Sequence, residues 1–166
     1  MDNERLSLKK FNQYFLLGQL ISMGLLILGF FFINEKQDNI LQIAGWLFIV
    51  MGIVFIFIFI QRKQRLLWIY KNISPTSMQM KIEKTDDSDS TNYVAYLTRW
   101  ENNTSERWKT RLYPPSCNIQ VFLSHENQVE VYVDPKNNNP AVIRTTEGLL
   151  WVMAGSGSVQ NFQKSQ

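Results

Sequence analysis

Residues 40–60 read ILQIAGWLFIVMGIVFIFIFI and contain no charged side chain. A second uncharged stretch, residues 14–33, reads YFLLGQLISMGLLILGFFFI. An α-helix needs about 20 residues to cross roughly 30 Å of hydrocarbon, and both stretches reach that length. The β-branched end of residues 40–60 is also expected to be helical in lipid, because an isolated strand there would leave its backbone hydrogen bonds unmade. The sequence therefore predicts a transmembrane helical hairpin over residues 14–60.

Two alternatives for these stretches remain. A soluble protein can bury such helices in its core, but about 18 uncharged apolar residues in a row favour a helix that spans a bilayer. A cleaved signal peptide would explain residues 14–33. The first alanine of the chain is Ala44, so no Ala-x-Ala cleavage site follows that stretch, and we expect a retained anchor.

Positive charges flank the predicted hairpin at its two ends. The connecting loop, residues 34–39, has Lys36 as its one positively charged residue. The flanking cations are Arg5, Lys9 and Lys10 before the hairpin and Arg62, Lys63, Arg65 and Lys71 after it. The positive-inside bias then predicts an integral, multi-pass membrane protein with both termini and the C-terminal domain on the cytoplasmic side.

Small residues on the two predicted spans suggest where the helices touch. They would let the two backbones approach closely, although glycine is also common in membrane helices generally. They are Gly18, Ser22 and Gly29 in the first span and Gly45 and Gly52 in the second. Neither span contains Asp, Glu, Lys, Arg or His, so the sequence does not predict a transport pathway through the hairpin.

Residues 61–72 are expected to continue the second helix into the membrane interface, where Trp68 and Tyr70 would lie at headgroup level. The cations Arg62, Lys63 and Arg65 of this segment are candidates for binding anionic lipid headgroups. Together with Lys71 they also explain the overall net charge of +3, because the chain from residue 72 onward has nine Lys and Arg and ten Asp and Glu, a net charge of −1. The excess of positive charge therefore lies beside the predicted membrane spans, and we expect no nucleic-acid partner.

The rest of the chain has the period-2 alternation of β-strands. We expect a soluble β domain over residues 73–154, a flexible Gly/Ser/Gln-rich tail over residues 155–166 and a cytoplasmic tail over residues 1–13. Strands are predicted near residues 78–83, 93–100, 106–112, 119–123, 129–133, 141–144 and 149–153, with an exposed loop over residues 85–90. The predicted fold class is an α+β membrane protein, in which a two-helix hairpin precedes a small antiparallel β-barrel or sandwich.

One stretch of this domain resembles a known family. Residues 131–137 read VYVDPKN and are followed by Pro140, Ala141, Val142 and Ile143. This pattern resembles the signature of a membrane-associated β-rich module catalogued as domain of unknown function thirty-five ninety-two, in which a Val-Tyr-Tyr-Asp-Pro-x-Asn-Pro turn precedes an Ala-x-Leu strand. Asn138 stands where the family has its second proline. The resemblance implies a β-rich module near a membrane and carries no assigned activity.

Chemically reactive residues are few. His125 is the sole histidine and is expected in a solvated turn, and Cys117 is the sole cysteine and is expected to be half-buried. Asp86, Asp87 and Asp89 lack the glycine and the terminal glutamate of a calcium loop. We therefore predict no catalytic residue, no metal site and no cofactor.

Arg107, Lys109 and Arg111 alternate along a predicted strand, so they should project from one face while Trp108, Thr110 and Leu112 project from the other. The two interpretations of this cationic stripe are an ordinary polar outer face and a contact with anionic headgroups or an acidic partner surface.

Two function classes follow from these observations. The first is a non-catalytic accessory or assembly subunit that docks its hairpin on a larger membrane complex, contacts the lipid bilayer and presents the β domain to partners. The second is a small membrane-anchored ligand-binding protein or enzyme whose site is not recognisable from the order of residues.

Overall fold

Two long helices, α1 (Asp2–Asn34) and α2 (Asn39–Asn72), begin the computed structural model. The structure describes residues 2–34, 39–87, 90–101, 104–113, 117–123, 125–153 and 159–163. The chain divides into two units. We call Phe11–Arg65 the hairpin unit, and Met1–Lys10 together with Leu66–Gln166 the β unit. Each helix therefore begins or ends inside the β unit.

The helices are longer than the apolar stretches that predict them. Residues 2–13, which the sequence suggests as a tail, form the first turns of α1. This correction has a tertiary cause, because the first turns of α1 contact the sheet of the β unit, as described below. Helix α2 ends at Asn72, whose side-chain amide donates to the carbonyl of Trp68 at 2.8 Å, just before Pro75. By length and composition, both helices could cross a membrane.

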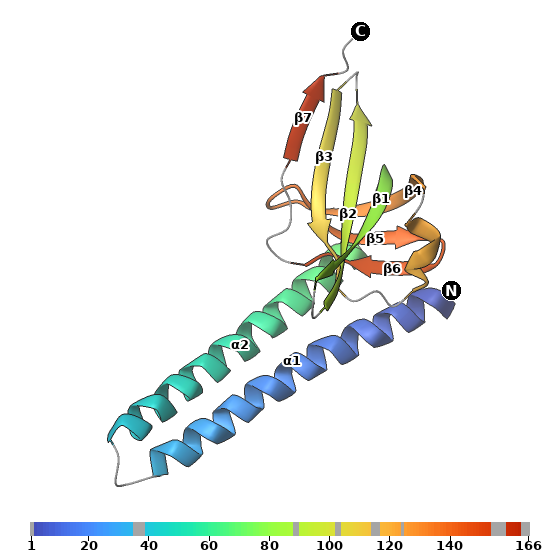
Figure 1. Ribbon diagram of the computed structural model, residues 1–166. Coiled ribbons are helices and arrows are strands. Elements are labelled where there is room, and N and C mark those ends of the chain that lie inside the picture. The colour runs from blue at the N-terminus through green and yellow to red at the C-terminus, as the bar shows by residue number, and fades with distance from the viewer. Residues whose placement is uncertain are drawn as a thin grey trace. The chain divides into compact units, whose positions relative to one another are not determined.

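The β unit contains an antiparallel sheet with the strand order β6-β5-β4-β1-β2-β3-β7 (Figure 1). Its strands are β1 (Thr76–Asp87), β2 (Ser90–Glu101), β3 (Thr104–Arg111), β4 (Asn127–Asp134), β5 (Asn139–Thr145), β6 (Gly148–Trp151) and β7 (Val159–Gln163). Alternation of apolar and polar residues along β1 and β3 places one side-chain set in the core and the other outside. The α+β layout of two apolar helices followed by an antiparallel sheet agrees with the sequence prediction.

The sheet is open, whereas the sequence suggests a barrel or sandwich. An isolated β-bridge joins Leu112, beyond β3, to Val152, beyond β6. The backbone N–H of Met153 donates to the carbonyl of Arg111 at 2.8 Å beside it. Strand β7 pairs with β3 from Thr104 to Trp108. It therefore occupies the edge of β3 with which β6 would pair in a closed barrel.

One face of the curled sheet encloses the hydrophobic core. Strands β1 to β6 all contribute side chains to this core, so the sheet must bend around it. Its largest buried members include Trp108, Met80, Ile82, Leu97, Ile143 and Leu150. Trp108 is 1% exposed, and its indole N–H donates to the backbone carbonyl of Asn138 at 3.2 Å, which satisfies the one polar atom of a buried side chain.

Residues 119–123 are predicted as a strand, and the structure corrects this. Ile119–Phe122 form the 3-10 helix η1, in which Ile119 and Phe122 are both buried. Residues three apart share a face in a 3-10 helix, so the buried pair Ile119 and Phe122 suits this element, whereas a strand would bury residues two apart. The side chain of Asn118 accepts from the backbone N–H of Gln120 at 3.3 Å and caps it.

Two other predicted irregular segments are strands. The predicted loop over residues 85–90 is mostly paired, since Thr85 faces Asn92 and Asp87 faces Ser90 in the β1–β2 ladder. Ser88 and Asp89 lie outside the described residues. In the predicted flexible tail, Val159–Gln163 form β7. Backbone pairing with the edge of β3 orders this mostly polar segment, and no apolar pattern in the sequence predicts that pairing.

Candidate functional site

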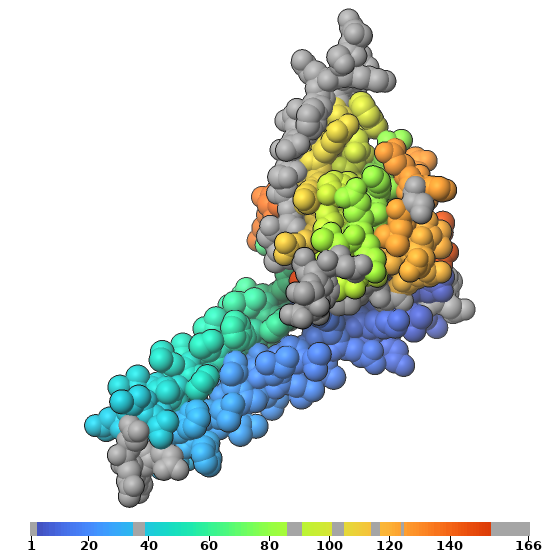
Figure 2. Space-filling view, viewed as in Figure 1, coloured from blue at the N-terminus to red at the C-terminus, as the bar shows by residue number. Residues whose placement is uncertain are grey.

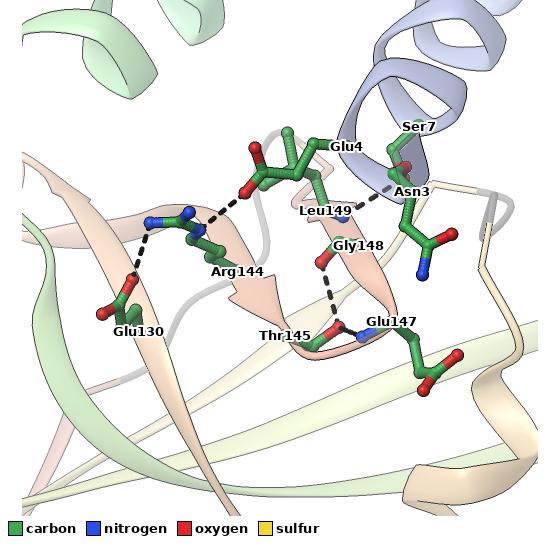
Figure 3. Close-up of polar contacts among 9 residues, drawn as sticks. All are labelled: Asn3, Glu4, Ser7, Glu130, Arg144, Thr145, Glu147, Gly148 and Leu149. Carbon is green, nitrogen blue, oxygen red and sulfur yellow. Dashed lines mark hydrogen bonds and ion pairs between the residues drawn. The ribbon is translucent and has the colours of Figure 1, made fainter. Parts of the chain in front are cut away.

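The first turns of α1 dock on the β5–β6 hairpin within the β unit (Figure 3). The Ser7 hydroxyl donates to the carbonyl of Asn3 at 2.9 Å and accepts from the backbone N–H of Leu149 at 3.2 Å. Ser7 is fully buried. Gly148 has φ +135°, and a Cβ there would lie 2.6 Å from the Ser7 oxygen. Glycine is required at this position both by the backbone conformation and by the close approach of the helix. We call this contact the N-terminal latch.

Ion pairs extend the latch across two strands. Arg144 on β5 donates from Nε to Oε1 of Glu4 at 2.6 Å, and from Nη1 to Oε2 of Glu130 on β4 at 3.3 Å (Figure 3). The hydrogen bond to Glu4 raises the pKa of Arg144 above its usual value, and the charge of Glu4 adds to this effect. Side-chain exposure of Arg144 is 46%, so these pairs orient the helix more than they stabilise it. The sequence does not predict the latch, because Glu4 and Arg144 are 140 positions apart.

The end of α2 also packs on the sheet. Tyr70 is half-buried, and its ring lies 5.3 Å from that of Tyr132 on β4 and 6.1 Å from that of Trp151 on β6. Leu66 and Ile69 of the same helix are buried. Trp68 is 53% exposed on the other side of the helix. Of the two aromatic residues that the sequence suggests for the interface, Trp68 is exposed and Tyr70 contacts the sheet through Tyr132 and Trp151.

The helix packing of the hairpin unit involves all five small residues that the sequence suggests. A Cβ on Gly45 would lie 2.7 Å from the carbonyl oxygen of Gly29, and a Cβ on Gly52 would lie 3.0 Å from that of Ser22. A Cβ on Gly18 would lie 2.8 Å from the ring of Phe59. Figure 2 shows α1 and α2 packed side by side along the hairpin. Glycine at these positions lets the two backbones approach to contact distance.

The juxtamembrane cations lie on α2. Arg62, Lys63 and Arg65 belong to the hairpin unit and are partly exposed.

On β3, Arg107, Lys109 and Arg111 are exposed, whereas Trp108, Thr110 and Leu112 are buried, as alternation along the strand predicts. The Lys109 ammonium lies 5.7 Å from the centre of the Tyr96 ring on β2. These three cations therefore share the outer face of the sheet.

A groove of about 690 Å³, lined by both polar and apolar atoms, lies beside the latch in the β unit. It runs from Pro75 before β1, past Ser77, to Glu130, Arg144 and Thr145. Ser77 accepts a hydrogen bond from the Gln128 amide at 2.9 Å, and Thr145 donates to the carbonyl of Gly148 at 2.9 Å. The groove offers hydroxyls, an amide and a charged pair to a small polar molecule.

Among the described residues, His125 and Cys117 are the remaining candidates for chemistry. His125 is exposed, and Cys117 is partly buried against the core, where burial raises the pKa of its thiol. The side chains of Asp86 and Asp87, like the whole of Asp89, lie outside the described residues. In the part of the chain that the structure describes, no three His, Cys, Asp or Glu residues come together in a group that could hold a metal ion.

The signature turn that resembles a known family has a defined geometry. Oδ1 of Asp134 accepts from the backbone N–H of Lys136 at 3.0 Å, and the carbonyl of Asp134 accepts from the N–H of Asn138 at 2.9 Å. Asn138 has φ 55°. A proline ring holds φ near −65°, so proline cannot occupy position 138 in this turn. Asparagine at position 138 thus has a local structural reason.

No family model, curated protein or solved structure matches the chain. The resemblance around residues 131–143 therefore stays a prediction.

Proposed function

We propose that this chain is an integral membrane protein that acts as a non-catalytic accessory or assembly subunit. Large apolar side chains are exposed along both helices of the hairpin unit, and this is the observation that carries the proposal. On α1, Ile27 is 68% exposed and Phe31 is 63% exposed; on α2, Ile43 is 63% exposed and Phe57 is 60% exposed. Exposure of such side chains to water is unfavourable by about 25 cal/mol per Å² of apolar surface, whereas lipid removes that cost.

The course of the chain supports a topology for this proposal. The chain leaves the β unit after Lys10 and returns to it at Leu66, so two spans bring it back to the side from which it left. The cations before and after the hairpin favour the cytoplasm for that side. The N-terminus and the β unit would then share the cytoplasmic face, and the loop with Lys36 would face the opposite side.

The subunit role is supported by the way in which the β unit is attached. Residues from the first turns of α1 and the last turn of α2 both pack on its sheet, through Ser7 and Glu4 and through Tyr70. The chain connects this folded module to the hairpin unit through both α1 and α2, and a module carried on a membrane hairpin is suited to present a surface to partners. The lipid-facing helices can also pack against the helices of a larger complex through the same apolar surface.

Extraction tests the membrane proposal, and native purification tests the subunit role. After an alkaline carbonate wash, the chain should stay in the membrane pellet; release into the wash would contradict a spanning hairpin. In mild detergent it should co-migrate with a larger complex. Migration as a single chain that carries no partner would contradict the subunit role while leaving the membrane proposal intact.

Cysteine labelling tests the topology. In a Cys117→Ser background, Lys36→Cys should react with a membrane-impermeant maleimide on intact cells, and Lys9→Cys should react only after lysis. The reverse pattern would overturn the cytoplasmic assignment.

A ligand-binding role is the second candidate, and the groove beside Arg144 favours it. A polar molecule that binds there should raise the thermal unfolding midpoint of the purified chain, and Ser77→Ala with Thr145→Val should reduce that increase. A screen of polar metabolites that produces no shift would count against this role.

A further inference from the structure

The outer face of β1, β2 and β3 gathers positive charge in three cross-strand rows. The pairing register aligns Gln79 with Thr98 and Arg107, Lys81 with Tyr96 and Lys109, and Glu83 with Val94 and Arg111. Directly opposed residues in antiparallel strands point to the same face. These rows therefore place Lys81, Arg107, Lys109 and Arg111 together with Glu83, and we call this surface the cationic face.

The charge of this face differs from that of its domain. Its three rows hold four cations and one carboxylate, a net charge of +3, whereas the chain from residue 72 onward has nine cations and ten carboxylates, a net charge of −1. An even distribution of charge would not concentrate four of nine cations on three adjacent rows. The excess attracts an anionic partner and steers its approach.

Interactions within the face hold several of its side chains in place. Lys81 contacts the carboxylate of Glu83 at 3.1 Å, and Lys109 lies over the Tyr96 ring. At one end, the indole N–H of Trp100 donates to Oε1 of Gln79 at 3.2 Å, and Trp100 remains 47% exposed. The face thus combines cations, two of them arginines, with an exposed tryptophan, and Arg and Trp are residue types enriched at the binding hot spots of protein interfaces.

The cations on β3 also have a regular spacing. Arg107, Lys109 and Arg111 are two residues apart, so their Cα atoms repeat every ~6.6 to 6.8 Å along the strand. Carboxylates at alternate positions of an extended peptide repeat at the same distance. Lipid headgroups have no fixed spacing in a fluid bilayer, so this regularity favours a peptide.

We infer that the cationic face binds an extended acidic segment of a partner protein, whose alternate carboxylates contact Arg107, Lys109 and Arg111 and whose end packs on Trp100. This inference depends on the proposed role of the chain as a subunit that presents its β unit to partners. It identifies the chemistry of one such partner.

Peptide binding to the full chain in nanodiscs of neutral phosphatidylcholine tests the inference. One fluorescent peptide alternates glutamate with threonine and ends in leucine; the other has the same composition with its glutamates in one block. Anisotropy should show tighter binding of the alternating peptide. Equal affinity for the two peptides would overturn the proposed register.

Charge-matched variants test the location. Lys109→Gln with Arg111→Gln should weaken binding of the alternating peptide about tenfold, the order expected for the loss of two exposed ion pairs. The control variant, Lys84→Gln with Lys136→Gln, removes the same charge elsewhere on the β unit and should bind like the parent chain. Equal weakening in both variants would overturn the inference, because net charge alone would then explain the binding.

Two further ligands test the class of partner. Vesicles with 30% phosphatidylserine and a single-stranded oligonucleotide of equal charge should not depend on Lys109 and Arg111. A loss of vesicle or oligonucleotide binding in the double variant, with peptide binding unchanged, would overturn the acidic-peptide assignment. Unchanged thermal unfolding midpoints verify that the variants fold. Co-migration with a complex is measured separately, so a failure of peptide binding is distinct from a failure of the subunit role.

Discussion

The hydroxyl oxygen of Ser7 lies 3.2 Å from the backbone nitrogen of Leu149, 142 positions away in the sequence, and accepts its hydrogen bond. This contact fixes the first turns of α1 to the β5–β6 hairpin. Leu149 is fully buried, so its N–H has no access to water if the bond is lost. The latch makes the N-terminal segment a part of the β unit.

Ser7→Ala should destabilise the β unit by about 1–3 kcal/mol, because the buried N–H of Leu149 would lose its acceptor. Denaturant unfolding of the β unit in detergent measures this free energy, and hydrogen exchange at Leu149 should accelerate in parallel. Ser22→Ala is the matched control. The Ser22 hydroxyl is also buried but donates within its own helix, to the carbonyl of Gly18 at 2.9 Å. Its loss should therefore lower the free energy of unfolding by less. Equal costs for the two variants would contradict the latch.

Gly45→Ala should weaken the packing of the hairpin unit by about 1–3 kcal/mol, because the new Cβ would force apart backbones that are already in contact. Unfolding in mixed micelles reports the change. Gly24→Ala is the control, since a Cβ at Gly24 would meet nothing within 4 Å. It should be neutral or stabilise the helix by up to about 1 kcal/mol, through the higher helix propensity of alanine. Similar destabilisation by both variants would argue against close packing at Gly45.

Asn138→Pro should destabilise the β4–β5 turn by more than about 1 kcal/mol, since proline cannot adopt the positive φ and removes the N–H that donates to Asp134. Asn138→Gly can adopt the positive φ and keeps the N–H, so its unfolding free energy should stay within about 0.5 kcal/mol of the parent value. Tryptophan fluorescence should change in Asn138→Pro, because the Trp108 indole donates to the carbonyl of residue 138. A stable proline variant would show that the turn tolerates the family pattern.

Glu83 should make stability depend on pH in the acid range. The hydrogen bond from Lys81 lowers the pKa of Glu83 below its usual value; desolvation acts in the opposite direction, and a hydrogen bond from Tyr96 and the charge of Lys109 lower the pKa further. A carboxylate with a lowered folded-state pKa contributes stability above its unfolded pKa and loses it as the pH falls through the folded pKa. The parent chain should therefore be more stable than Glu83→Gln at neutral pH, and the difference should vanish below the folded pKa. A pH-independent difference would contradict this electrostatic origin.

Local composition was sufficient for several parts of the structure. The uncharged residues 14–33 and 40–60 predicted two helices, and alternation predicted which side of β3 carries Arg107, Lys109 and Arg111. Pro75 limited α2, which ends at Asn72. In each case the information is contained in neighbouring residues, where side-chain period and backbone restriction act directly.

Long-range contacts decided the other parts. Ile119–Phe122 form a 3-10 helix because they fill the core without a strand to pair with, and the polar segment Val159–Gln163 becomes a strand because β3 offers it an edge. The latch of Ser7 and Glu4 on β5 and β6 likewise depends on residues that the fold brings together.

By itself, the sequence determined the apolar hairpin, the β character of the C-terminal part and the alternation that places cations outside, because these depend on the order of neighbouring residues. Only the tertiary structure decided the open sheet, the docking of the N-terminus and the assembly of Lys81 with Lys109 across Tyr96. These features depend on strand order and on hydrogen bonds between residues far apart in the chain, and no local pattern encodes such pairings.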